Sequence, residues 1–466
     1  MDTPAPHRRP HRRSANSTVT TTAPRTHPAG RPDATMERVP ASSRLRRLFA
    51  DTRPFQSPHY TRLFTANIIT VIGAQLTVIT VPAQLWAITR DSSIVGLTGI
   101  VGLVPLVIFG LWGGAIADAF NRRRVLEITT LGLIITGFMF FAQAALGLDN
   151  VPLILAIFAL QQAFFAVNQP TRTALLPSIM PAAHLASANA LNMTLFSFGA
   201  VAGPLLGGAL LPLLGFAPLY LIDALFLFAT LYAVHKLPPL RPVGATQAPG
   251  LRSVLDGLKV AWINKVLLAS FVVDLIAMIF GMPRALYPQL ADENFGGPPT
   301  GGIEFALLSA ALAIGALIGG LFSGWTGRVS WLGRATLNSI AVWGVAIVLA
   351  GAAAMLAPRF GTIMLVAAVA ALAIAGAADM ASAAMRQTIL QTAATDEMRG
   401  RLQGVFIVIV AGGPRVADAL HGLAAQSLGA GPATLAGGAL VVVGIAVCVV
   451  ALPGFRRYQI PVGTTR

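Results

Sequence analysis

Twelve long apolar segments, each close to the length of a membrane-spanning helix, constrain this sequence more than any other feature. A helix that crosses the hydrocarbon core of a bilayer needs about 20 mostly apolar residues. Only 11% of the 466 residues are charged and 55% are hydrophobic, whereas an ordinary soluble domain has about 25% charged residues. The sequence therefore predicts an all-α membrane protein with 12 transmembrane helices. The expected spans lie at about 62–87, 94–118, 125–147, 151–171, 187–214, 217–236, 264–290, 303–325, 335–357, 360–384, 402–427 and 432–453.

A polar stretch at 237–262 divides these spans into two sets of six. Two short motifs, Gly-rich after the second span and Thr/Arg-rich after the fourth, recur after the eighth and tenth spans. Repeated units related by an axis along the membrane normal are a transporter architecture with the binding site between the halves. The predicted organisation is a disordered basic tail (1–55), a six-helix bundle (56–236), a cytoplasmic linker with a short amphipathic helix (237–262), a second six-helix bundle (263–455) and a second tail (456–466).

The net charge of +15 is explained by topology and does not indicate a nucleic-acid partner. Many of the 33 basic residues precede the first span, and most others lie in alternate loops. Basic loops stay on the cytoplasmic side, so we predict a multi-pass protein of the inner (cytoplasmic) membrane with both termini cytoplasmic. The residues counted on the cytoplasmic side include Arg172 and Arg386, while Arg90, Arg284 and Asp292 are counted outside. Whether translation starts at Met1 or Met36 stays open.

A motif after the second span resembles the loop 2–3 signature of the major facilitator superfamily. It combines a glycine, an acid and three arginines, here Gly114, Asp118, Arg122, Arg123 and Arg124. It departs from the usual pattern at Ala119 and Asn121. The resemblance covers about residues 55–455. It implies the major facilitator fold, two pseudo-symmetric six-helix bundles, and a gating role for this loop.

A second motif in the fifth expected span resembles the antiporter motif of the same superfamily. It comprises four glycines and a proline: Gly199, Gly203, Pro204, Gly207 and Gly208. Small residues four apart let two helices approach closely, and proline bends the helix axis. The alternative is a role in helix packing alone. Segments 283–292 and 387–401 resemble a branch of the superfamily that contains siderophore exporters and multidrug efflux pumps, so the resemblance implies export.

Ionisable residues inside the expected spans are candidates for a proton site, because charge at that depth is costly. Arg415, Asp418 and His421 are three residues apart and share a helix face. An Asp–His pair could bind and release a proton near neutral pH. The alternative is an Arg415–Asp418 ion pair that only stabilises the helix. Asp418 is the first candidate proton site, followed by Asp274 and Asp379.

Other polar residues in the spans are candidates for lining a substrate cavity. For each of them an interhelical hydrogen bond is an equally good explanation. They are Asn67, Gln75, Gln84, Asn168, Gln169 and Asp223.

No enzyme motif accompanies these features. The sequence has no phosphate-binding Gly-x-x-x-x-Gly-Lys-Ser/Thr loop and no Gly-x-Ser-x-Gly motif, and with Cys448 as its single cysteine it predicts no cofactor or Cys-rich metal site. We predict a monomeric secondary transporter that exports siderophore-like or amphipathic drug-like small molecules in exchange for protons, by alternating access. The alternatives are a non-transporting membrane receptor or partner protein, and, with less support, an uptake symporter.

Overall fold

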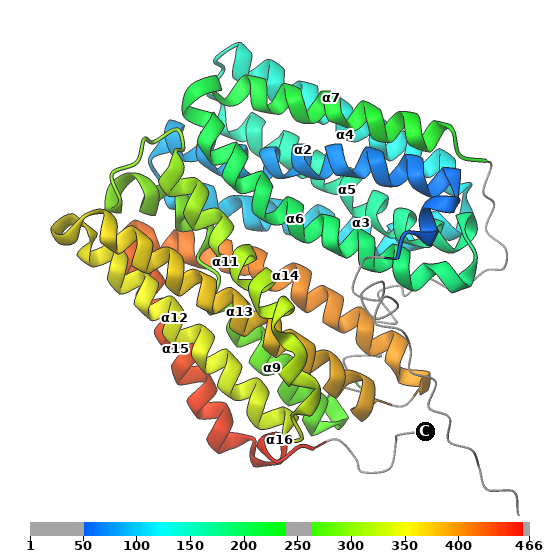
Figure 1. Ribbon diagram of the computed structural model, residues 1–466. Coiled ribbons are helices and arrows are strands. Elements are labelled where there is room, and N and C mark those ends of the chain that lie inside the picture. The colour runs from blue at the N-terminus through cyan, green and yellow to red at the C-terminus, as the bar shows by residue number, and fades with distance from the viewer. Residues whose placement is uncertain (1–50, 239–258, 260–261, 395, 460–466) are drawn as a thin grey trace, which may run out of the picture. The chain divides into compact units, whose positions relative to one another are not determined.

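The computed structural model describes residues 51–238, 259, 262–394 and 396–459, and every element in these ranges is helical (Figure 1). Twelve helices are long and apolar enough to cross a membrane, which confirms the predicted number. The tail before residue 51 and most of the linker with its predicted amphipathic helix lie outside the described residues. In the first half, a short 3-10 helix η1 (Arg53–Gln56) precedes α2 (Pro58–Thr89), α3 (Ser92–Ala119), α4 (Arg122–Ala145), α5 (Val151–Ile179), α6 (Ala182–Leu214) and α7 (Phe216–His235).

The second half repeats this series with one irregular segment. Its long helices are α9 (Lys265–Phe280), α11 (Ile303–Leu321), α12 (Leu332–Phe360), α13 (Thr362–Ala393), α14 (Asp396–Leu428) and α15 (Ala430–Ala451). The short elements are η2 (Arg284–Leu286), α10 (Tyr287–Gln289), η3 (Leu290–Asn294), η4 (Ser323–Arg328) and α16 (Pro453–Arg456).

The two halves use the same set of helix pairs. In the first half α2 packs on α6 and α7, α3 on α5, and α4 on both α5 and α7. In the second half the corresponding pairs recur: α9 packs on α14 and α15, α11 on α13, and α12 on both α13 and α15. The halves meet through α3 with α14 and through α6 with α11, which are equivalent positions exchanged between the repeats. This pairing is the pseudo-symmetry that the sequence echoes predicted.

Three of the expected helix limits differ from the structure by about eight residues or more. The helix expected at 151–171 continues to Ile179 and the one expected at 360–384 continues to Ala393. Arg172 and Arg386 therefore lie inside helices and not in the cytoplasmic loops where the charge count placed them. The helix expected at 264–290 ends at Phe280, because Pro283 and Pro288 cannot donate to a continuing helix.

Residues 51–55, which the sequence assigned to the tail, belong to the folded part of the chain. Helix η1 packs against α6, and Ser187 Oγ donates to Asp51 Oδ2 over 2.6 Å. Arg53 and Asp51 form an ion pair of 2.7 Å. Hydrogen bonds from the Arg53 guanidinium and the Ser187 hydroxyl hold the pKa of the Asp51 carboxyl well below its usual range.

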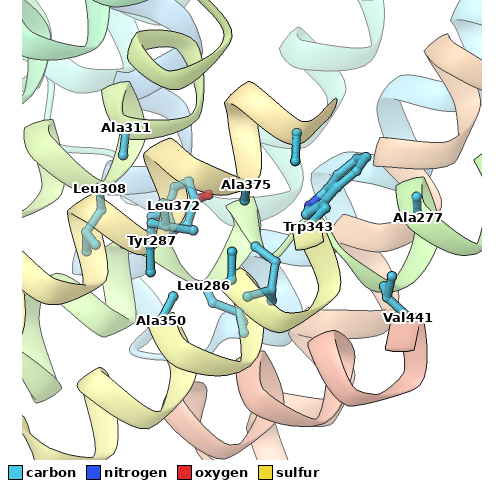
Figure 2. Close-up of a cluster of buried hydrophobic side chains, with 14 of the residues drawn as sticks. Ala277, Leu286, Tyr287, Leu308, Ala311, Trp343, Ala350, Leu372, Ala375 and Val441 are labelled. Atoms are coloured by element: carbon cyan, nitrogen blue, oxygen red, sulfur yellow. The ribbon is translucent and has the colours of Figure 1, made fainter. Parts of the chain in front are cut away.

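The largest hydrophobic core belongs mainly to the second half and surrounds Trp343 (Figure 2). The Trp343 side chain is fully buried, and its indole Nε1 donates to the carbonyl of Gly281 over 3.0 Å. Gly281 follows the last residue of α9, where backbone carbonyls lose their helical partners. Trp343 thus stabilises the core and satisfies the backbone at the break after α9.

We expect Trp343→Ala to lower the free energy of unfolding by about 3–5 kcal/mol, since it removes a large buried ring. Trp343→Phe keeps most of the packing and loses the hydrogen bond, so its cost is about 1–2 kcal/mol. Thermal unfolding of the purified protein in detergent measures both. A Trp343→Phe variant as stable as the wild-type protein would contradict a role for the Nε1 hydrogen bond.

Candidate functional site

A cavity of about 340 Å³ lies between the two halves. Helices α2, α3, α5 and α6 line it from the first half, and η2, α10, α11 and α14 line it from the second. Its walls are mainly apolar, with Val, Ile, Pro and Phe side chains, and only a few polar groups converge on it. The polar and charged lining residues are Gln75, Thr98, Gln162, Arg284, Tyr287, Ser309, Arg415 and Asp418.

Asp418 pairs with an arginine that lies far from it in the sequence. Arg284 Nη2 donates to Asp418 Oδ2 over 3.0 Å, so the ion pair expected between Arg415 and Asp418 is replaced by this one. Arg415 instead donates to the carbonyl of Ala411 over 2.9 Å and to Gln162 Oε1 over 3.0 Å. The contact with Gln162 joins α14 to α5, which belong to opposite halves.

His421 forms its hydrogen bond within its own helix and not with Asp418. Its Nδ1 lies 3.0 Å from the carbonyl of Ala417 in its own helix, and its ring packs against Gly437 of α15. The side chain is buried between α15 and the end of α9. The structure therefore brings Asp418 and Arg415 to the cavity and leaves His421 outside its lining.

Asp274, Asp379 and Arg386 form a buried charge cluster in the second half. Arg386 Nη1 lies 2.9 Å from Asp274 Oδ1, and Arg386 Nη2 lies 3.5 Å from Asp379 Oδ1. The Arg386 and Asp274 side chains are 2% and 1% exposed, whereas Asp379 is 25% exposed. Two carboxylates share one guanidinium, so the fully ionised cluster carries one excess negative charge inside the expected membrane-spanning region.

Most of the predicted cavity residues of the first half make interhelical hydrogen bonds instead. Arg172 Nη1 donates to Asn67 Oδ1 over 2.7 Å, which joins α5 to α2. Asn168 Nδ2 donates to Thr129 Oγ1 over 2.8 Å, which joins α5 to α4. Asp223 is buried and accepts a hydrogen bond from Thr77.

A second polar group in the same half surrounds Gln84. Its amide exchanges hydrogen bonds of 3.0 and 3.2 Å with Gln143, and Tyr220 Oη donates to Gln84 Oε1 over 2.9 Å. Gln75 is the one predicted cavity residue that lines the cavity. Gln169 is exposed.

The glycine motif of α6 allows close packing on two faces of that helix. A Cβ on Gly207 would lie 3.3 Å from Leu76 of α2, in the same half, while a Cβ on Gly208 would lie 2.7 Å from Cα of Ala306 in α11. The Gly302 N–H also donates to the Gly208 carbonyl over 3.0 Å. All five motif residues, Gly199, Gly203, Pro204, Gly207 and Gly208, are buried. A side chain at Gly208 would push the two halves apart.

The arginines of the loop 2–3 motif begin α4. Arg122 Nη1 donates to the carbonyl of Ala174 over 3.0 Å, and Arg124 is exposed. Gly114 and Asp118 lie in α3, and their side chains are outside the described part of the structure.

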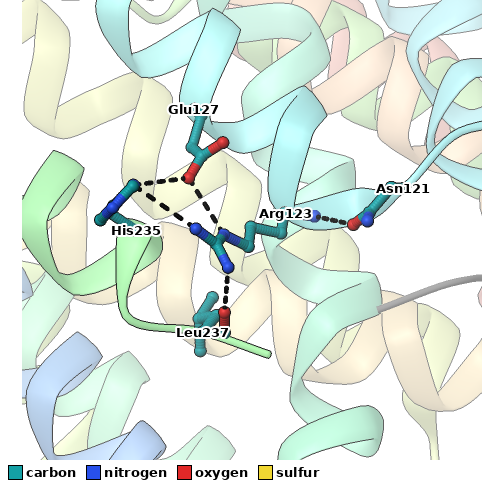
Figure 3. Close-up of polar contacts among 5 residues, drawn as sticks. All are labelled: Asn121, Arg123, Glu127, His235 and Leu237. Carbon is teal, nitrogen blue, oxygen red and sulfur yellow. Dashed lines mark hydrogen bonds and ion pairs between the residues drawn. The ribbon is translucent and has the colours of Figure 1, made fainter. Parts of the chain in front are cut away.

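Arg123 ties α4 to the end of α7 (Figure 3). Its guanidinium donates to Glu127 Oε1 over 3.0 Å and to the carbonyl of Leu237 over 2.8 Å. His235 Nδ1 lies 3.1 Å from the same Glu127 oxygen. Asn121, where the motif usually has glycine, accepts from the backbone N–H of Arg123 over 3.1 Å. These contacts stabilise the first half.

Several polar contacts join the halves at the end where α2 meets α3. Trp86 Nε1 donates to Asp292 over 2.8 Å, and Arg90 forms an ion pair with the same carboxylate. Ser92 Oγ donates to Gln289 Oε1 over 2.7 Å. The α3–α14 contact begins at this end, where Gly96 packs on the backbone of α14.

The sequence did not identify four residues that matter here. Arg284 was assigned to an outer loop and Arg386 to an inner loop, yet each pairs with an aspartate in the structure. Gln162 and Tyr287 line the cavity without having been selected. Only Arg386 had a local signal, since it follows Asp379 by seven residues and so shares its helix face. Within the described ranges, no group of His, Cys, Asp or Glu side chains could hold a metal ion.

The fold and the cavity between its halves define a membrane transporter rather than an enzyme. The model of the Major Facilitator Superfamily matches residues 63–417. The chain belongs to this superfamily.

Known relatives agree with this assignment. The chain is 30% identical over 416 residues to the enterobactin exporter EntS of Shigella boydii serotype 4 (strain Sb227), covering 86% of this chain and 94% of that protein. The exporter of Escherichia coli O139:H28 (strain E24377A / ETEC) gives the same identity and coverage.

Solved structures of low sequence identity share the fold. The nucleoside transporter NupG is 15% identical with a TM-score of 0.68, covering 86% of this chain and all of that chain. A bacterial homologue of the human lysosomal transporter Spinster is 16% identical with a TM-score of 0.66, covering 88% of this chain and all of that chain.

We expect Arg386→Met to destabilise the protein by about 3–5 kcal/mol, because it leaves two buried carboxylates without their cation. Adding Asp274→Asn to that variant restores part of the loss, since the remaining cluster then has one acid fewer. Chemical or thermal unfolding in detergent measures the coupling. Exposed Arg457→Met is the matched control, with an expected change within about 0.5 kcal/mol. Additive effects of the two buried substitutions would contradict the ion pair.

Proposed function

We propose that this chain is a proton-coupled exporter of siderophore-like or amphipathic small molecules. The observation that carries the proposal is the cavity between the halves, which has apolar walls and a few convergent polar groups, as small-molecule sites do. The likeness to enterobactin exporters over most of the chain and the buried glycine motif of α6 support export over uptake. The protein would act as a monomer in the inner membrane, with both termini cytoplasmic.

Transport would proceed by alternating access of the cavity to the two sides of the membrane. In this arrangement, the contacts of Asp292 with Trp86 and Arg90, and of Gln289 with Ser92, close the end that faces outward. A cargo molecule can leave only when these contacts break. The opposite end would then close through the helices that carry the loop 2–3 arginines.

The cluster of Asp274, Asp379 and Arg386 is our candidate for the coupling proton. A net negative charge inside the membrane is costly, so one proton on a carboxylate neutralises the cluster. Asp379, the partly exposed acid, is the one to which a proton has access. Asp418 was the first candidate from the sequence. Because Arg284 already balances its charge, we rank it after the cluster as a proton site.

Transport of cargo into energised, inverted membrane vesicles tests the coupling to protons. With enterobactin and a fluorescent amphipathic dye as cargo, we expect accumulation in wild-type vesicles that a protonophore abolishes. Asp379→Asn should lose gradient-driven accumulation and keep exchange of labelled for unlabelled cargo, because the cavity is intact while the proton is no longer exchanged. Asp149→Asn, outside the cavity and the cluster, is the control.

Loss of both accumulation and exchange in a well-folded Asp379→Asn protein would make Asp379 structural. Unchanged accumulation in that variant would exclude the cluster as the coupling site. No transport of either cargo by the wild-type protein would favour the receptor interpretation.

Cross-linking tests the outward closure. In a Cys448→Ser background, Ser92→Cys with Gln289→Cys places two thiols where the side chains now touch. A short reducible thiol cross-linker should hold this end closed and stop transport, and dithiothreitol should restore it. Ser92→Cys alone, treated in the same way, is the control. Continued transport by fully cross-linked protein would contradict closure at this end.

A further inference from the structure

The charges that line the cavity do not balance. Among the described residues, the charged ones that line the cavity are Arg284, Arg415 and Asp418, so two guanidinium groups share one carboxylate. Asp418 is engaged by Arg284 through a hydrogen-bonded ion pair of 3.0 Å. The Arg415 guanidinium donates to two neutral acceptors, a backbone carbonyl and the Gln162 amide. The cavity therefore carries one excess positive charge while Asp418 is ionised.

Unpartnered hydroxyl groups accompany this charge. Tyr287 is 3% exposed and Ser309 is partly buried, and neither hydroxyl has a hydrogen-bond partner within the described residues. Both residues line the same cavity. A buried hydroxyl without a partner is costly, so these groups are donors that a bound molecule would satisfy.

The remaining walls accept an apolar body. Phe158 of α5 and Phe305 of α11 line the cavity from opposite halves. Aliphatic side chains complete the apolar walls, together with two prolines from the first half. The exposure of the charged pair is uneven, since the Arg284 side chain is 45% exposed and that of Asp418 is 14% exposed. The Arg284 side chain is thus more accessible than the carboxylate that neutralises it.

We infer that this cavity binds an organic anion, a molecule with an aromatic or aliphatic body and a planar two-oxygen acidic group such as a carboxylate. The Arg415 guanidinium receives the acidic group, because its planar fork matches two adjacent oxygens. Tyr287 and Ser309 donate further hydrogen bonds. Asp418 competes with the ligand for the arginines and pairs with Arg284 when the cavity is empty. The inference rests on the proposed function, since it names the class of cargo.

Binding of a matched pair of probes to the purified full-length protein tests this inference. The probes are 2-naphthoate and its neutral counterpart 2-naphthamide, which have the same ring system and differ in charge. Equilibrium dialysis against protein in nanodiscs of zwitterionic lipid gives both affinities without a gradient. We expect wild-type protein to bind 2-naphthoate more tightly than 2-naphthamide.

We expect substitutions at Arg415 and Asp418 to change the affinity for 2-naphthoate in opposite directions. Arg415→Gln should weaken 2-naphthoate binding about tenfold or more, because a charged hydrogen bond is lost, and should leave 2-naphthamide within about twofold. Asp418→Asn should strengthen 2-naphthoate binding, since the competing carboxylate is gone. Exposed Arg456→Gln removes the same charge away from the cavity and should change neither probe.

Two results would overturn the inference. One is equal or weaker binding of 2-naphthoate than of 2-naphthamide to the wild-type protein. The other is an equal loss of both probes in Arg415→Gln, which would make Arg415 structural. Selective anion binding without any transport in vesicles would leave the inference standing and refute the proposed function instead. Transport of neutral dyes without selective anion binding would do the reverse.

Discussion

Close approach of helix backbones is the constraint on which the rest of this structure depends. Inside a bilayer, apolar side chains gain little by leaving lipid for protein, so helices associate where small residues allow tight packing. Gly208 lets α6 contact Ala306 of α11, and Gly96 with Gly422 does the same for α3 and α14. These contacts join the two halves, and the cavity lies between them.

The two halves differ in how their buried polar and charged side chains are paired. In the first half, the buried polar side chains are mostly satisfied by each other, as in the pair of Gln84 with Gln143. In the second half, Asp274 and Arg386 are paired by charge, yet both Asp274 oxygens lack hydrogen bonds within the described residues. A half whose buried polar groups are mostly satisfied, opposite a half with unsatisfied buried charge, fits the proposed role of the second half in binding the proton.

The sequence predicted the helices well and the side-chain partners poorly. Apolar runs of spanning length are a local property, so the twelve helices were found. The break after Phe280 was missed because proline inside an apolar run is compatible with a membrane helix. Arg386 was placed in a loop because its helix continues beyond the apolar run. The partner of Asp418 is Arg284, 134 residues away, and no local pattern can connect them. The glycine motif was recognised from its spacing, but that Gly208 faces the other half required the structure.

The irregular segment between α9 and α11 both lines the cavity and contacts the first half. Arg284 and Tyr287 line the cavity, while Gln289 and Asp292 hold the contacts that close the outward-facing end in the proposed orientation. Residues on α5 and α6, such as Phe158 and Ala200, touch the cavity without such contacts. In the proposed mechanism, substitutions at such positions alter cargo preference alone, whereas substitutions in 283–292 alter preference and opening together. We therefore expect relatives with different cargo to differ more at the cavity positions of α5 and α6 than in 283–292.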